Sequence, residues 1–183
     1  MKKINRIVIC FGIIFFFVFS AEAKYPKVKN IIFLIGDGMG LNQMYAGMTY
    51  NKNSLQLERC THIGLVKTYS ANKYVTDSGA GGTALACGVK TNNQMIGMGS
   101  DSVAVESILH LAEKNSLSTG VVVACNVTHA TPASFVAHQV SRKMTQEIAA
   151  DYLKTDIDVF IGGGRDDFEK RKDNRNLSEE LKL

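Results

Sequence analysis

Short apolar runs alternate along this chain with segments of helical periodicity. The apolar runs occupy residues 31–35, 62–69, 120–125 and 159–161, and helical patterns occupy 40–50, 78–87, 101–113 and 144–154. Strands that alternate with helices are typical of a parallel sheet, whose strands are continuous in apolar residues because both faces are covered. We therefore predict an incomplete α/β fold with a doubly wound, mostly parallel sheet and helices on both faces. In this fold 31–35 and 120–125 are buried strands.

Polar residues that can carry chemistry follow three of these apolar runs. Asp37 follows the first, the segment leading to Ser78 follows the second, and His129 follows the third. In open α/β sheets, ligands bind outside the carboxyl ends of the strands. The three loops are therefore expected to meet at one site.

The first 23 residues have the pattern of a secretory signal. Lys2, Lys3 and Arg6 precede an apolar run over 7–19, and 21–23 (AEA) supplies small residues for cleavage after Ala23. A retained anchor is the alternative, although the run is short for a membrane span. We expect a periplasmic or secreted protein in which 24–183 form the N-terminal part of one domain, with no membrane span once the signal is removed.

Charge and cysteine content exclude several other classes. Loss of three basic residues and one acidic residue with the signal lowers the formal charge from +4 to +2, and no basic cluster favours nucleic-acid binding. Cys60, Cys87 and Cys125 remain, an odd number without metal-type spacing. We expect Cys87 and Cys125 to be buried thiols rather than disulfide partners. The charged tail from Asp166 onward is expected to be exposed.

Residues 75–83 (VTDSGAGGT) place Asp77 and Ser78 directly before a run of small residues. A serine at the start of a helix is exposed, and the free N–H groups and dipole of the first turn favour a bound anion. Small neighbours let a phosphoryl group approach the backbone. The pattern predicts a serine nucleophile for phosphoryl transfer. The alternative is a glycine-rich turn capped by Ser or Asp.

Four further residues carry suitable chemistry. Asp37, between two glycines, can bind a cation, or it can form an Asx turn. His129 and Thr131 can contribute to a metal site, or Thr131 can cap a helix that has Pro132 as its first residue. Arg142 can bind two phosphate oxygens with its planar fork, or it can be a solvated surface arginine.

Taken together, these segments closely resemble the alkaline phosphatase family. Residues 75–83 match the family's nucleophile motif, 30–40 (NIIFLIGDGMG) resemble its first strand and metal-binding turn, and 129–142 (HATPASFVAHQVSR) resemble its third block. The resemblance extends from about Asn30 to Arg165. It implies hydrolysis of phosphate monoesters, an alkaline phosphatase-like fold and a homodimer.

The resemblance also implies roles for individual residues. Ser78 would form a phosphoseryl intermediate, and Arg142 would bind the phosphate while Asp77 holds it in orientation. Two Zn²⁺ and one Mg²⁺ are expected, with these residues at or beside them: Asp37, Ser78, His129 and Thr131. Some members carry aspartate at the position of His129, and imidazole favours Mg²⁺ less than carboxylate does. We therefore expect weaker magnesium retention than in an aspartate-type member.

The residues after Arg142 do not match the family's remaining metal ligands. Asp156, Asp158, Asp166 and Asp167 have no histidine partner downstream, and the last histidine is His138. A zinc site needs three or four ligands. The alternative function is therefore a truncated, catalytically inactive fragment with at most weak metal or phosphate binding.

Overall fold

The computed structural model describes residues 28–182, so the signal prediction for 1–23 lies outside the described residues. The chain divides into two units, 1–36 and 37–183. In the first unit, the predicted buried strand at 31–35 is wrong. These residues form no regular element, and all but Ile35 are exposed, Ile31 by 86% and Leu34 by 87%. An apolar run becomes a strand only where a neighbouring strand pairs with it, and no strand among the described residues does so.

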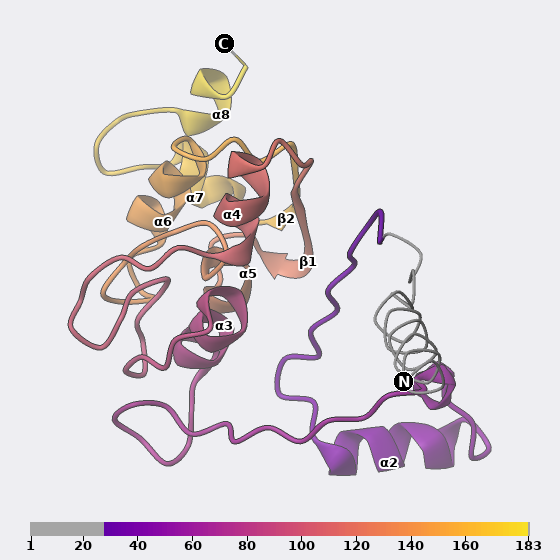
Figure 1. Cartoon of the computed structure of the whole chain (residues 1–183). Helices are drawn as coiled ribbons and strands as arrows, with labels where there is room; N and C mark the ends of the chain where they lie inside the picture. The colour runs from indigo at the N-terminus through magenta and orange to yellow at the C-terminus, as the bar shows by residue number, and fades with distance from the viewer. Residues whose placement is uncertain (1–27, 183) are drawn as a thin grey trace, which may run out of the picture. The chain divides into compact units, whose positions relative to one another are not determined.

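The second unit is built from short helices and one small sheet (Figure 1). In chain order its elements are α2 (Leu41–Tyr50), the 3₁₀ helix η1 (Gln56–Arg59), α3 (Ser78–Cys87), α4 (Ile108–Lys114), β1 (Gly120–Asn126), α5 (Ala130–Ala133), α6 (Thr145–Tyr152), β2 (Val159–Gly163), α7 (Arg165–Glu169) and α8 (Leu177–Glu180). No helix among residues 28–182 has both the length and the apolar character needed to span a membrane.

Strands β1 and β2 pair in parallel, with Gly120 opposite Val159 and Val122 opposite Ile161. The chain between them contains α5 and α6, as a parallel connection requires. The predicted α/β fold with a parallel, incomplete sheet is therefore confirmed. The expectation that 120–125 is buried is wrong, because Val122 is 71% exposed. Val121 and Val123 pack against the core, whereas Val122 lies on the opposite face of β1, so the core covers only one face of this strand.

Local sequence explains where the helices begin. Asp77 caps α3 by accepting a hydrogen bond from the N–H of Ala80, and Gly88 ends α3 in a left-handed conformation with φ of 69°. Ser107 caps α4 in the same way, so the predicted helix over 101–113 is shortened to α4. Pro132 is the third residue of α5 rather than its first, a first-turn position that needs no N–H donor.

Three other predictions need correction. Residues 62–69 form no strand, and Leu65 in that segment is fully exposed. The thiol of Cys125 is exposed, and that of Cys87 is only half-buried. The charged tail is not wholly exposed, because Phe168 of α7 and Leu177 of α8 are buried in the core. Isolated apolar residues in a polar segment can pack inward on short helices, which composition alone does not reveal.

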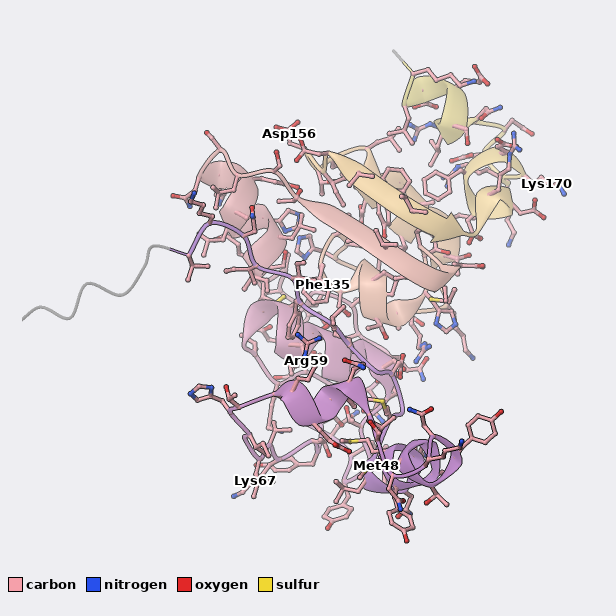
Figure 2. All side chains as sticks on the ribbon, turned by 90° about the vertical axis from the view of Figure 1, so that its right-hand side faces the viewer. Met48, Arg59, Lys67, Phe135, Asp156 and Lys170 are labelled. Carbon is pink, nitrogen blue, oxygen red and sulfur yellow. The ribbon has the colours of Figure 1, made fainter. Side chains whose placement is uncertain are left out.

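The core lies between the sheet and α4 to α8, and α3 packs on α5 next to it. Tyr152 of α6 is fully buried, donates a hydrogen bond to the carbonyl of Val127 at 2.8 Å, and contacts the rings of Phe160 and Phe168. Asp156, before β2, lies at the end of the sheet away from α3, whereas Phe135, after α5, lies between the sheet and α3 (Figure 2). The packing of α3 on α5 places the residues that follow β1 beside α3.

Candidate active site

Ser78 is the first residue of α3, and its partly exposed side chain lies at the start of this helix. The carboxylate of Asp77 accepts a hydrogen bond from the N–H of Ala80 at 3.0 Å. The N–H groups of Ser78 and Gly79 have no protein acceptor among the described residues. A Cβ on Gly79 would lie 2.9 Å from the carbonyl oxygen of Met95, so only glycine fits after the serine. The site therefore offers a hydroxyl beside two free N–H donors.

Asp37 connects Ser78 to the loop that follows β1. Its Oδ1 accepts a hydrogen bond from Ser78 Oγ at 3.2 Å, and its Oδ2 accepts one from Thr131 Oγ1 at 2.7 Å. Asp37 lies in an exposed turn that Gly38 completes with φ of 69°, a conformation that favours glycine. One carboxylate thus joins three segments that are distant in the sequence.

Arg142 pairs with Asp77, the residue directly before the serine. Its Nη1 is 3.4 Å from Asp77 Oδ2, and both side chains are largely buried, with 22% and 18% exposed. The backbone reinforces this pair, because Arg142 N donates to the carbonyl of Gln94 while Gln94 N donates to Asp77 Oδ2. A guanidinium held at one nitrogen still has donors free for an anion. Asp77 therefore caps α3 and also fixes Arg142.

His129 is less closely attached to this group. It occupies the N-cap position of α5, two residues before Thr131, and its side chain is exposed. Within residues 28–182, no hydrogen bond joins its ring to Asp37 or Thr131. Thr131 does not cap α5, as the alternative supposed, because its hydroxyl donates to Asp37.

The donor atoms around Asp37 suit a hard cation. Two carboxylate oxygens and the hydroxyls of Ser78 and Thr131 converge there, and such oxygens are the ligands that Mg²⁺ prefers. Among the described residues, however, no three His, Cys, Asp or Glu side chains form a group that could hold a metal ion. The residues present therefore fit part of a magnesium site, and they do not assemble a complete zinc site.

Sequence reasoning did not find Asn93 and Gln94, which hold the segment before Ser78 in place. Asn93 Oδ1 accepts a hydrogen bond from Asp77 N at 3.2 Å, and its Nδ2 donates to the carbonyl of Val75 at 3.0 Å. Nothing in residues 92–94 (NNQ) distinguishes them from an ordinary polar loop. They take this role only because the chain after α3 folds back against the residues that precede α3.

Comparison with known proteins identifies the family of this chain. The family model described as alkaline phosphatase matches residues 28–182. Alkaline phosphatase 3 of Bacillus subtilis is 39% identical over 175 residues, which cover 88% of this chain and 37% of that protein. The alkaline phosphatase of the Antarctic bacterium TAB5 superposes with a TM-score of 0.78 at 44% identity, covering 80% of this chain and 43% of that one. The chain belongs to the alkaline phosphatase family.

A second similar solved structure contains bound magnesium. It is a histidine-to-aspartate mutant of the TAB5 enzyme with Mg bound in its M3 site, and it superposes with a TM-score of 0.77 at 44% identity, covering 80% of this chain and 42% of that one. In each of these comparisons the present chain spans less than half of the relative's length.

Proposed function

We propose that this chain is the N-terminal part of an alkaline phosphatase that hydrolyses phosphate monoesters through a phosphoserine intermediate on Ser78. The observation that carries the proposal is the carboxylate of Asp37, which accepts hydrogen bonds from both Ser78 and Thr131. Arg142, held by Asp77, supplies guanidinium N–H donors for the phosphoryl group. Family membership supports the same reaction.

In the first half of this reaction, the phosphate of the substrate lies between Arg142 and the N–H groups of Ser78 and Gly79. The hydrogen bond from Ser78 to Asp37 turns the lone pairs of Oγ toward phosphorus. The Oγ–P bond forms, the bond from phosphorus to the alkoxy oxygen breaks, and the serine proton passes through water to the departing alcohol. Arg142 and the N–H donors stabilise the charge on the non-bridging oxygens.

In the second half, water attacks phosphorus from the side that the alcohol has left. The new O–P bond forms, the Oγ–P bond breaks, and Ser78 regains a proton from the attacking water. Asp77 keeps the guanidinium of Arg142 in place through both halves, because its carboxylate is itself fixed by Ala80 and Gln94. Inorganic phosphate is then released.

The proposed cofactors are one Mg²⁺ and two Zn²⁺. Asp37 and Thr131 would hold Mg²⁺ with His129 beside it, and Asp37 and Ser78 would face one zinc. Bound cations supply a lowered pKa for the serine hydroxyl and neutralise charge on the entering and leaving oxygens. The Mg in the M3 site of the TAB5 mutant supports the magnesium part of this proposal.

A second candidate concerns residues 1–183 taken alone, which would bind metal or phosphate weakly and catalyse nothing. The observation that favours it is the lack of a three-residue metal group among residues 28–182. The chain also spans only 37% of the Bacillus subtilis relative. The two candidates are compatible if further residues complete the site.

The test is release of p-nitrophenol from its phosphate with added Zn²⁺ and Mg²⁺. Residues 1–183 alone are expected to show no activity above a Ser78→Ala control. If the reading frame continues beyond Leu183, the longer product is expected to turn over substrate, and Ser78→Ala is expected to abolish that turnover. Activity that survives Ser78→Ala in the longer product would contradict the role of this serine.

For location and assembly we propose a periplasmic or secreted homodimer. The support for export is the signal pattern of residues 1–23, and the support for dimerisation is the family resemblance. The mass of the protein recovered from the cell envelope or medium tests the first point, with a start at Lys24 expected. Light scattering of the longer product tests the second.

A further inference from the structure

Ser134, at the C-terminal end of α5, connects the two segments that carry the site. Its side chain is buried, with 1% of the residue exposed. Its Oγ donates to the carbonyl oxygen of Ala130 at 2.8 Å and lies 3.4 Å from the carbonyl oxygen of Gly79. Ala130 is the residue before Thr131, and Gly79 is the residue after Ser78. One buried hydroxyl therefore bridges α5 and the first turn of α3.

Thr83 extends this bridge on the side of α3. It is fully buried, and its Oγ1 lies 3.5 Å from Ser134 Oγ. The same Oγ1 accepts a hydrogen bond from Gly97 N at 3.0 Å. We call Thr83 and Ser134 the hydroxyl seam. Buried polar groups of this kind hold a defined geometry because separating them leaves donors and acceptors unpaired.

Gly82 lets the two helices approach closely at the seam. A Cβ on Gly82 would lie 2.7 Å from Ser134 Oγ and 3.4 Å from Thr131 Cα. The first distance is too short for any real contact, and Ser134 Cβ would lie at 3.1 Å, so a side chain here would force Ser134 to shift. The spacing of the two helices is thus set by direct contact at Gly82 and Ser134.

We propose that Ser134 is a positioning residue that sets the distance between Ser78 and Thr131. Asp37 has one carboxylate oxygen hydrogen-bonded to each of these hydroxyls, at 3.2 and 2.7 Å, so a shift of α3 against α5 would break one of the two bonds. Figure 1 shows α3 next to α5. Figure 2 shows Phe135, the residue that follows Ser134, between the sheet and α3. The role of Ser134 in setting the α3–α5 distance does not depend on the proposed function. Only the value of that distance for metal and phosphate binding rests on it.

The spacing can be measured without any metal. In the purified chain, the nuclear Overhauser effect between the α-protons of Gly82 and Thr131 reports directly on the α3–α5 distance. We expect Ser134→Ala to weaken this effect. Gly82→Ala is a second variant that keeps the hydroxyl and places a methyl group against Ser134. Because this methyl group replaces the α-proton that faces Thr131, the helix spacing in this variant is followed by Mn²⁺ broadening instead.

A second measurement uses Mn²⁺ as a paramagnetic probe of the Asp37 site. In the wild-type chain, Mn²⁺ is expected to broaden the amide signals of both Ser78 and Thr131. In Ser134→Ala, the broadening of Thr131 is expected to persist while that of Ser78 decreases. The affinity is expected to fall roughly tenfold, the effect typical of removing a partner that orients ligands.

The control is Ser70→Ala. Ser70 is also buried, and its hydroxyl contacts Asn72 and Lys73 rather than α3 or α5. It should lower stability without changing the Gly82–Thr131 effect or the Mn²⁺ pattern. An unchanged Gly82–Thr131 effect in Ser134→Ala, together with unchanged broadening in both Ser134→Ala and Gly82→Ala, would overturn the proposal, and so would equal losses in Ser70→Ala. If Mn²⁺ broadens neither signal in the wild type, the metal part of the proposed function fails, and the proton measurement still decides the role of Ser134.

Discussion

Thr131 Oγ1 lies 2.7 Å from Asp37 Oδ2, although the two residues are 94 positions apart in the sequence. The other oxygen of the same carboxylate accepts a hydrogen bond from Ser78, 41 positions away. A single acidic side chain thus determines how the loop after β1 meets the start of α3. Three of the predictions below follow from this arrangement and its neighbours, the fourth concerns the pH dependence of stability, and the fifth concerns the core.

Asp37→Asn should weaken binding of Mn²⁺, used as a probe for Mg²⁺, by roughly tenfold or more, because the amide keeps the shape of the side chain but loses its charge. Titration followed by electron paramagnetic resonance measures the free ion. Asp166→Asn is the matched control, since the side chain of Asp166 is 73% exposed and pairs with Lys170 at the surface. Equal affinity in the wild type and Asp37→Asn would show that the carboxylate does not bind the cation.

His129→Asp should raise the magnesium retained after dialysis, because a carboxylate is a harder ligand than imidazole and suits Mg²⁺ better. Metal analysis of the dialysed wild type and variant gives the ratio of Mg to protein. The exposed ring of His129 can be replaced with little change in packing. Equal magnesium content in the two proteins would rule out an effect of this position.

Arg142→Lys should weaken binding of inorganic phosphate roughly tenfold, because lysine cannot present two parallel donors while it is held by Asp77. The width of the ³¹P resonance during titration in the presence of Zn²⁺ and Mg²⁺ measures the affinity. Arg165→Lys is the control, because Arg165 is 83% exposed and pairs with Glu169 on α7. A loss of similar size in both variants would point to overall charge rather than to a specific site.

The fourth prediction concerns pH and stability. Burial lowers the pKa of His110 below its usual value of 6.5, and the neighbouring His138, stacked at 5.3 Å, lowers it further. Glu113 and Glu106 oppose this shift, and Lys114 adds to it. As the pH falls, His110 binds a proton in the unfolded chain at a higher pH than in the folded chain, because its pKa is lower in the folded state. The contribution of His110 to stability is therefore present above about pH 6.5 and is lost as the pH falls below it.

Urea unfolding at pH 7.5 and pH 5.5 measures this contribution. The free energy of unfolding should fall between the two pH values by less in His110→Gln than in the wild type, since glutamine binds no proton. Titrating groups that do not interact with His110 affect both proteins equally. A fall of the same size in the two proteins would exclude His110 as a source of the pH dependence.

Leu177→Ala should lower the free energy of unfolding by about 2–5 kcal/mol, because Leu177 of α8 is completely buried. Leu181→Ala, four residues further on, is the matched control with 43% of the residue exposed, and it should cost much less. Urea unfolding of both variants provides the comparison. Similar small losses would mean that α8 does not pack on the core.

Local signals in the sequence were sufficient to predict several helices and strands. Asp77 and Gly88 mark the ends of α3, and the valine-rich run of β1 and the apolar start of β2 are strands as predicted. These features depend on caps, periodicity and branched side chains, which act over a few residues. The run 31–35 has the same strand signal but forms no strand, because pairing requires a partner that local sequence does not supply.

The sequence by itself determined the family and the chemical types of the site residues, because a serine, two carboxylates, a threonine and an arginine stand in a recognisable order. Only the tertiary structure decided which of them meet. It joined Asp37 to Thr131, fixed Arg142 against Asp77, and left the ring of His129 exposed. It also placed Ser134 between the two site segments. Such contacts depend on how helices pack across long sequence separations, and that packing is a property of the whole fold.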